Sequence, residues 1–373
     1  MLKRCMGKGI QFFKADLVFT ISLLLALLSM LFVPPNPGYL NYLDYSVLAT
    51  LFCLMCVVAG FRKSGLLSWI SRHVLRLARH ARTVSLLFVL LCFFCAMLLT
   101  NDVCLTAFVP LTLVVLHGSS PLRIAWVVAL ETTAANLGSM LTPIGNPQNL
   151  YLYAHYQMEP AAFFSAVAPV CAVSFVILFG CVFLSGRGKP LEAPGEDAPL
   201  QKRRLGLHLV LFALCLLTVL RVLDYRVSFL LVLAALLVLD REILPAVDYR
   251  LLGTFAAFFI LVGNLGSIGA VRSFLAELMQ GRELLVSVLV SQVTSNVPAA
   301  IMLSGFTENG RALLLGTNIG GLGTLVASLA SLISYRLYLG GEKARPGLYL
   351  GIFTALNVCL LLILTPFASA VCL

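Results

Sequence analysis

Apolar residues fill most of this chain in long stretches, and the lengths of these stretches predict helices that cross a membrane. A helix needs about 20 mainly apolar residues to span a hydrocarbon core of about 30 Å. Single spanning helices are therefore predicted at about 17–33, 43–60, 161–185, 205–222, 226–240, 250–270 and 347–371. The pattern predicts an all-α integral membrane protein.

Two other apolar runs, 84–117 and 284–307, are interrupted by polar residues near their middle. The interruptions read Thr-Asn-Asp at 100–102 and Thr-Ser-Asn-Val-Pro at 294–298. A straight helix over the 34 residues of the first run would extend about 51 Å, which is too long for the membrane core. We predict that both runs fold back as re-entrant hairpins that enter from opposite faces.

A helix predicted over 122–155 contains a polar stretch at 137–149 in which it should unwind. Pro removes a backbone donor and Gly weakens a helix. Unwound backbone at membrane depth is tolerated only where it is buried in protein or lines a wet cavity. The stretch is therefore a candidate binding site, with the candidate residues Asn136, Gly138, Thr142, Pro143, Gly145, Asn146 and Asn149.

A second polar stretch repeats this pattern inside a helix predicted over 310–339, with unwinding expected near 317–324. The segment Asn318–Ser331 aligns without gaps on Asn136–Asn149, 182 residues earlier. Interrupted segments at matching positions in two halves point to a transporter site, whereas the alternative is Gly-rich helix packing that matches by chance. With the two hairpin tips, the further candidates are Thr100, Asn101, Asp102, Ser295, Asn296, Asn318, Gly320, Gly321 and Thr324.

The predicted organisation is two inverted-topology repeats, 1–185 and 205–373, with about 9–11 spanning helices, two hairpins and two unwound helices. The segment 186–204 between them is rich in Gly, Pro and charge and is predicted to be a cytoplasmic linker. Basic residues before the first span place the N-terminus in the cytoplasm. The segment 61–82 is basic and amphipathic, which predicts a helix on the cytoplasmic surface.

Composition supports this class and excludes others. The chain is 60% hydrophobic and 11% charged, whereas soluble domains carry about 25% charged residues. Lys and Arg outnumber Asp and Glu by 26 to 16, but they lie in short loops beside apolar spans, so membrane lipid and not nucleic acid is the expected partner. We expect no enzyme and no cofactor, because no nucleotide-binding loop, metal cluster or nucleophile–base set stands out.

The chemistry of the candidate residues suits a small anion, a cation, or both. Amide and hydroxyl oxygens suit Na⁺, with a possible site at Asn101, Asp102 and Asn136, whereas helix N-termini suit an anion. No Lys or Arg lies in either unwound stretch. Asp102 and Glu131 are intramembrane carboxyl groups and hence candidates for coupling to Na⁺ or H⁺. The alternatives are a helix cap for Asp102 and an interhelical hydrogen bond for Glu131.

These features leave three functional hypotheses open. The first is a secondary transporter of a carboxylate or inorganic oxyanion, coupled to Na⁺ or H⁺. The second is a Na⁺/H⁺ antiporter that uses Asp102 and Glu131. The third is a channel with gradient-independent conductance, or a membrane scaffold that transports nothing.

The motifs TND, NLGSMLTPIGNPQN, SNVPAA and GTNIGGLGTL resemble the ion transporter superfamily, above all its bacterial citrate transporter-like anion permeases. The resemblance implies a multi-pass protein of a bacterial-type cytoplasmic membrane, a homodimer, an elevator motion and no nucleic-acid partner. In the divalent-anion/sodium symporters of this superfamily, hairpin tips reading Ser-Asn-Thr form twin Na⁺ sites. This chain departs at the third position both times: Asp102 favours a proton or a tightly held cation, and Val297 removes a ligand.

Overall fold

The computed structural model describes residues 17–76, 80–184, 186 and 199–372, and within these ranges the chain forms helices and no strands. The first half contains α2 Leu17–Ser29, η1 Pro37–Asn41, α3 Tyr45–Lys63, α4 Leu66–Leu75, α5 Ala81–Cys95, α6 Asn101–Val115, α7 Pro121–Ser139, α8 Pro147–His155 and α9 Pro160–Phe183. The second contains α10 Lys202–Val219, α11 Tyr225–Leu239, η2 Arg241–Ala246, α12 Tyr249–Ser267, α13 Gly269–Met279, α14 Glu283–Thr294, α15 Asn296–Ser304, α16 Gly310–Gly320, η3 Leu325–Ala327, α17 Leu329–Leu339 and α18 Pro346–Val371. The prediction of an all-α membrane protein is confirmed.

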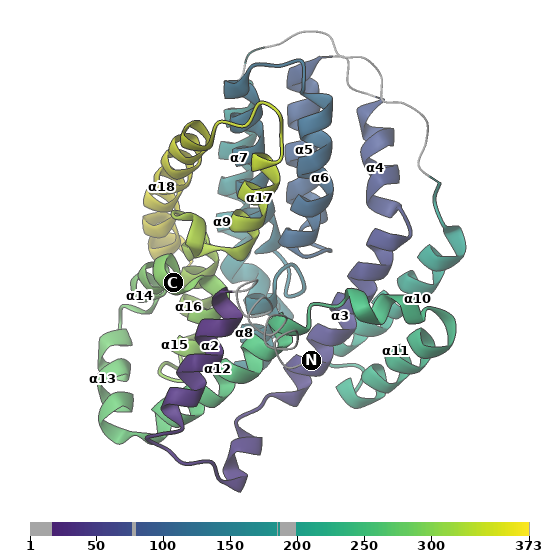
Figure 1. The fold of residues 1–373 in the computed structure, drawn as a ribbon. Helices are drawn as coiled ribbons and strands as arrows, with labels where there is room; N and C mark the ends of the chain where they lie inside the picture. The colour runs from purple at the N-terminus through teal and green to yellow at the C-terminus, as the bar shows by residue number, and fades with distance from the viewer. Residues whose placement is uncertain (1–16, 77–79, 185, 187–198, 373) are drawn as a thin grey trace, which may run out of the picture.

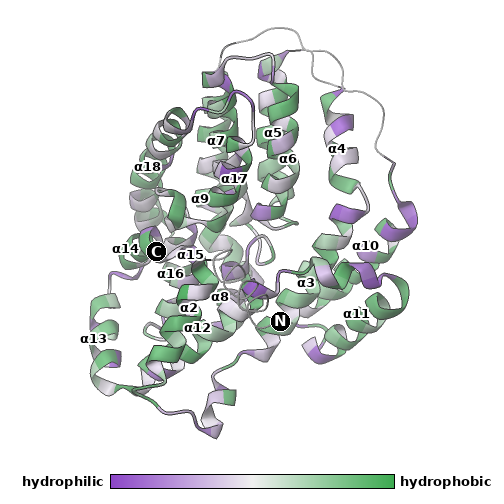
Figure 2. Cartoon of the chain, in the orientation of Figure 1, coloured by the Kyte–Doolittle hydropathy of each residue, from purple (hydrophilic) through white to green (hydrophobic). Residues whose placement is uncertain are grey.

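Four helices, α3, α9, α12 and α18, are each long and apolar enough to cross a membrane, counted over the described residues. Several shorter apolar helices, among them α5, α6 and α14, accompany them. Figure 2 shows apolar residues along most of the helices and hydrophilic ones gathered around α8 near the centre and at the start of α10. Polar groups are thus concentrated inside the helical assembly as well as at its ends.

The two predicted hairpins are present as helix pairs. In the first, residues 96–100 join α5 to α6, and in the second Ser295 alone joins α14 to α15. The predicted position of the first turn needs correction, because Asn101 and Asp102 are the first residues of α6 and not part of the break. The turn comes earlier because Thr100 has extended backbone and is the N-cap of α6, so helix formation begins directly after it.

Both predicted broken helices also occur. The first consists of α7 and α8, and its break covers 140–146 and not the whole of 137–149 as predicted, because α7 continues through Ser139. Asn146 begins α8 by accepting a hydrogen bond from the backbone N–H of Asn149 at 3.2 Å. Pro147 follows at the first helical position, where its missing N–H costs nothing. The second consists of α16, η3 and α17. Its break begins after Gly320 and not near 317 as predicted, with Gly323 at a φ of 98° that favours glycine.

The hairpins pack against the broken helices in a reciprocal manner. The helix α7 packs against both arms of the first hairpin, α5 and α6, and α16 packs against both arms of the second, α14 and α15. The second arm of each hairpin also packs against the far part of the other broken helix, α6 on α17 and α15 on α8. In Figure 1, α5, α6 and α7 stand side by side in the upper half and α8, α12 and α15 lie in the lower half, so the two breaks meet near the middle.

Two boundaries outside this centre differ from the predictions. The amphipathic segment predicted at 61–82 is divided, because α3 continues through Lys63 and only α4 is a separate helix; residues 77–79 lie outside the described residues. The predicted linker also overlaps α10, which begins at Lys202, and most of the remainder lies outside the described ranges. The first correction matters for the site, because it places Arg62 and Lys63 in the last turn of α3.

Candidate functional site

A cavity of about 620 Å³ lies where the two hairpin tips and the two helix breaks meet. The end of α3 and the start of α12 complete its walls. Its polar and charged lining residues are Arg62, Lys63, Thr100, Asn101, Asp102, Asn146, Gln148, Asp248, Asn296 and Ser328. A cavity assembled from both halves of the chain is the kind of place in which a small ligand is bound.

Five helices, α6, α8, α12, α15 and α17, begin at this cavity, since residues of their first turns line it. The N-terminus of a helix carries a partial positive charge and N–H groups without intrahelical partners. Such ends attract anions. Their convergence places several such partial charges at one cavity, and neither break contributes a charged side chain.

Two basic residues, Arg62 and Lys63, also line the cavity, and the sequence analysis did not include them among the candidates. The Lys63 ammonium group donates to the backbone carbonyl of Glu242 at 2.9 Å and lies 3.4 Å from its carboxylate. Hydrogen bonds from Lys63 and Arg204 lower the pKa of Glu242, so this carboxylate stays ionised. Arg62 is exposed and pairs with no acidic group in the described part of the chain. The sequence feature that could have indicated Arg62 and Lys63 is their position at the end of an apolar span.

Asn136, at the end of α7, forms a set of hydrogen bonds behind the cavity wall. Its side-chain oxygen accepts from the amide of Asn101 at 2.9 Å and from the hydroxyl of Ser328 at 3.1 Å. Its amide donates to the hydroxyl of Ser331 at 3.0 Å. Asn136 therefore joins the first hairpin tip to the break of the second half.

Asn318, at the end of α16, makes the matching connection in the opposite direction. Its amide donates to the oxygen of Asn149 at 2.6 Å, and its oxygen accepts from the amide of Asn146 at 3.3 Å. In the gap-free alignment Asn146 and Asn149 correspond to Ser328 and Ser331. Asn136 and Asn318 thus each bond two residues of the opposite half, and the residues bonded by one align with the residues bonded by the other.

Two aligned threonines attach the breaks to the hairpins. The hydroxyl of Thr142 donates to the carbonyl of Met97, and that of Thr324 donates to the carbonyl of Gln292 at 3.1 Å. Both carbonyls lie at or just beyond the end of a hairpin's first arm. These threonines therefore fix the position of each hairpin relative to its broken helix.

The aligned glycines, Gly138 and Gly320, allow the same helices to approach closely. A Cβ atom on Gly138 would lie 2.1 Å from the carbonyl oxygen of Phe93, and one on Gly320 would lie 2.7 Å from the hydroxyl oxygen of Ser291. A Cβ on Gly145 would likewise lie 2.2 Å from the carbonyl oxygen of Ser139. A side chain would collide with backbone at Gly138 and Gly145 and with the side chain of Ser291 at Gly320.

The structure divides the predicted site residues into two groups. Those that line the cavity are Thr100, Asn101, Asp102, Asn146 and Asn296. Those outside its lining are Asn136, Gly138, Thr142, Pro143, Gly145, Asn149, Ser295, Asn318, Gly320, Gly321 and Thr324. Many members of the second group hold the first in position, as the contacts above show.

The two carboxyl groups proposed for coupling are in different environments. Asp102 lines the cavity. Glu131 is fully buried, does not line it, and accepts a hydrogen bond from the hydroxyl of Thr112 across the interface of α7 and α6. The second carboxyl oxygen of Glu131 is buried and has no partner among the described residues. The predicted interhelical hydrogen bond of Glu131 is therefore present.

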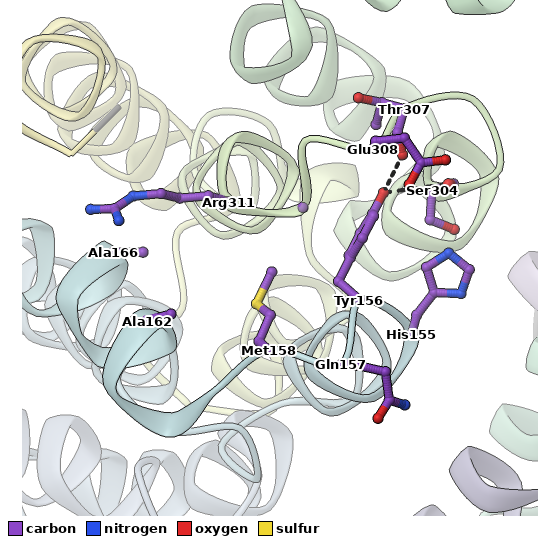
Figure 3. A pocket seen from close by; sticks show the side chains of 11 residues that line it. His155, Tyr156, Gln157, Met158, Ala162, Ala166, Ser304, Thr307, Glu308 and Arg311 are labelled. Atoms are coloured by element: carbon purple, nitrogen blue, oxygen red, sulfur yellow. Dashed lines mark hydrogen bonds between the residues drawn. The ribbon is translucent and has the colours of Figure 1, made fainter.

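A second, more open cavity of about 440 Å³ lies at the other end of α8 (Figure 3). Tyr156 extends across it and donates to the carbonyls of Thr307 at 2.8 Å and Ser304 at 3.3 Å. His155 and Arg311 also line it. Since Pro147 lines the central cavity and His155 lines this one, α8 connects the two.

A helical membrane protein whose hairpins and broken helices enclose a central cavity, with polar residues at the tips and breaks, has the architecture of a membrane transporter. The family model described as "Citrate transporter" matches residues 10–309. The chain belongs to this citrate transporter family.

Individual relatives agree with the family. The chain is 31% identical to "Uncharacterized transporter MJ0456" of Methanocaldococcus jannaschii over 94% of this chain and 96% of that protein. It is 30% identical to "Inner membrane protein YbiR" of Escherichia coli over 87% of this chain and 88% of that protein. "Uncharacterized transporter Rv2685" of Mycobacterium tuberculosis is 27% identical over 78% of each chain. These similarities, together with the fold, identify the protein as a membrane transporter.

Proposed function

We propose that the protein is a secondary active transporter that moves a small anion, a carboxylate or an inorganic oxyanion, by coupling to Na⁺ or H⁺. The observation that carries this proposal is the central cavity, at which five helix N-termini converge beside Arg62. Lys63 is paired with Glu242, and the carboxylate of Asp248 caps the start of α12. The partial positive charges of the helix ends and the full charge of Arg62 then favour a negatively charged ligand. The family description, citrate transporter, supports the same substrate class.

The coupling ion would act at the first hairpin tip. Asn101 and Asn136 already engage their side-chain oxygens as hydrogen-bond acceptors within the protein. The carboxylate of Asp102 is then the charged oxygen ligand that the cavity offers to Na⁺ or to a proton. The same observation favours Na⁺/H⁺ antiport as the second candidate function.

We also propose the wider organisation that the sequence suggested: inverted-topology repeats, an elevator motion and a homodimer in a cytoplasmic membrane. The reciprocal hydrogen bonds of Asn136 and Asn318 support a twofold relation between the halves. They also support movement of both hairpins and both breaks as one rigid unit. The name of the Escherichia coli relative, an inner membrane protein, supports the location.

Uptake by purified protein in proteoliposomes tests the proposal. We expect accumulation of radiolabelled citrate, succinate, phosphate or sulfate when a Na⁺ or pH gradient is applied, and none without it. Proton flux driven by Na⁺ in the absence of these anions would support antiport instead. Conductance that needs no gradient would refute both proposals.

The contribution of Arg62 can be separated in the same assay. We expect Arg62→Gln to raise the KM for the transported anion about two- to tenfold, because one partly solvated charge near the ligand contributes about 1 kcal/mol. Arg282→Gln, which removes an exposed charge at the start of α14, is the control and should leave KM unchanged. Equal KM values for both variants would remove Arg62 from the anion site.

A further inference from the structure

Gln148 differs from Asn101 and Asn146 at the central cavity, whose amide nitrogens both donate hydrogen bonds within the protein. It stands in the first turn of α8, lines the cavity and has 1% of its surface exposed. Its side-chain nitrogen is buried and has no hydrogen-bond partner among the residues that the structure describes. An unpaired buried donor is costly, and a water, an ion or a ligand that binds there would satisfy it.

Neighbouring amides show that packing does not explain this residue. Asn146 and Asn149, on either side of it, both use their amide nitrogens in hydrogen bonds within the protein. In the second half, Gln292 donates to the carbonyls of Gly320 and Leu322, each at 2.9 Å, and accepts from the N–H of Thr324 at 3.0 Å. Gln292 is thus a structural amide with its bonds satisfied, whereas Gln148 lines the cavity with its buried amide nitrogen unpaired among the described residues.

We propose that Gln148 is a substrate-binding residue whose side-chain N–H groups donate to an oxygen of the transported carboxylate or oxyanion. The proposal deepens the anion-transport function and rests on it. The N-termini of α6 and α15, which open onto the same cavity at Asn101 and Asn296, supply the remaining donors. A neutral amide suits this role because it binds an anion through direction and donor number, without a fixed charge that would hold the substrate too tightly for release.

Two substitutions of nearly the same size separate the possible roles of the amide. Gln148→Glu replaces the amide donor by a carboxylate, which accepts hydrogen bonds but cannot donate them. The carboxylate also repels an anion. If the amide nitrogen contacts the substrate, this variant loses uptake. If the amide oxygen instead binds Na⁺, the variant keeps uptake and requires less Na⁺, and this result would overturn the proposal.

Gln148→Leu removes the hydrogen-bonding group while it fills the space. An amide that contacts only substrate should be lost without harm to the fold, so we expect the melting temperature in detergent to stay the same or rise. The KM should rise about tenfold to a hundredfold, as expected for loss of a hydrogen bond to a charged group. A lowered melting temperature with an unchanged KM would identify Gln148 as structural and overturn the proposal.

The experiment compares four proteins in proteoliposomes: wild type, Gln148→Glu, Gln148→Leu and the control Gln280→Leu, whose exposed amide follows α13. The probes are radiolabelled citrate, succinate, phosphate and sulfate, under Na⁺ and pH gradients. Wild-type uptake with the control unchanged and both Gln148 variants impaired supports the proposal. Wild-type uptake with Gln148→Leu at the wild-type KM overturns it and leaves the proposed function standing. If wild type takes up none of the four anions, the proposed function and the role of Gln148 both fail.

Discussion

The two hairpin tips share one asparagine hydrogen bond and differ in the chemistry of the next residue. In the first, the oxygen of Asn101 accepts from the N–H of Asp102 at 3.0 Å; in the second, the oxygen of Asn296 accepts from the N–H of Val297 at 3.0 Å. The asparagine therefore begins the second arm in the same way in both tips. The tips differ at the next residue, which has a carboxyl group in the first tip (Asp102) and an apolar side chain in the second (Val297).

The two helix breaks also differ in the polarity of the side chains that they bring to the cavity, and the first is again the more polar. The first brings Asn146 and Gln148 to the cavity, whereas the second brings Ser328 and the apolar residues Leu329 and Ala330. The comparison teaches that the repeated residues mainly build the frame and that the unmatched residues carry the ligand chemistry. Predictions that test it compare aligned positions in the two halves.

The largest effect is expected at the aligned glycines. Gly138→Ala would place a Cβ atom 2.1 Å from a backbone carbonyl that cannot move without the hairpin, whereas in Gly320→Ala the nearest atom, at 2.7 Å, belongs to a serine side chain. We expect Gly138→Ala to cost about 3 kcal/mol of folding free energy and Gly320→Ala about 1 kcal/mol. Melting temperatures of the detergent-solubilised proteins measure both. Gly118→Ala, where nothing lies within 4 Å, is the control.

If Gly320→Ala lowers the melting temperature more than Gly138→Ala does, or if Gly138→Ala is as stable as wild type, then α5 and α7 are not packed as described. Loss of uptake in Gly320→Ala with an unchanged melting temperature would contradict the assignment of this glycine to the frame.

The next largest effect is expected at the reciprocal asparagines. Asn136→Ala and Asn318→Ala each leave buried polar partners in the other half without a hydrogen bond, at a cost of about 1–3 kcal/mol for each such group. We expect uptake to fall to background in both variants, because each loosens one hairpin tip or break from the opposite half. The exposed residue Asn41 offers a control in Asn41→Ala. Wild-type uptake in either variant would show that these bonds do not maintain the cavity.

Most of the frame could be predicted from sequence, because the signals were lengths and interruptions of apolar runs. Pro147 after Asn146 marks a new helix start, and the polar residues at 294–298 mark a hairpin tip. Boundaries were less accurate: Asn318 and Gly320 were expected in unwound backbone and lie in the last turn of α16. The helix continues there because neither a proline nor a left-handed glycine interrupts it before Gly323.

The cavity lining was predicted only in part, for a physical reason. The pattern of apolar and polar residues identifies residues that interrupt a helix. Such residues lie behind the wall of the central cavity as often as they line it. Arg62 and Lys63 gave no such signal, since a basic pair at the end of a span is an ordinary feature of membrane helices. Their position at the cavity follows from the packing of α3 against α8 and α12, which no local pattern records.

A smaller effect, on pH dependence and not on stability, is expected at the unmatched position of the tips. Asp102→Asn removes the charge that Asp102 can exchange for a proton or a cation, so uptake should lose its dependence on the pH or Na⁺ gradient. Val297→Thr introduces a side chain of nearly the same shape that does not titrate, so the pH dependence of uptake should remain that of wild type. Initial rates measured from pH 5.5 to 8.5 give both profiles. An unchanged profile in Asp102→Asn would assign this residue to the first turn of α6 alone, where an acidic residue favours the helix dipole.

The smallest effect concerns the backbone of the two tips. Ser295 has a φ of 76°, in the left-handed region, whereas Thr100 at the other tip has a φ of −66°. Glycine adopts the first conformation without strain, so Ser295→Gly should raise stability by about 1 kcal/mol or leave it unchanged. Thr100→Gly relieves no strain and adds freedom to the unfolded chain, so it should lower stability by about 0.5–1 kcal/mol. Opposite shifts in melting temperature would confirm that only the second tip is strained, and equal losses would place the strain elsewhere in the hairpin.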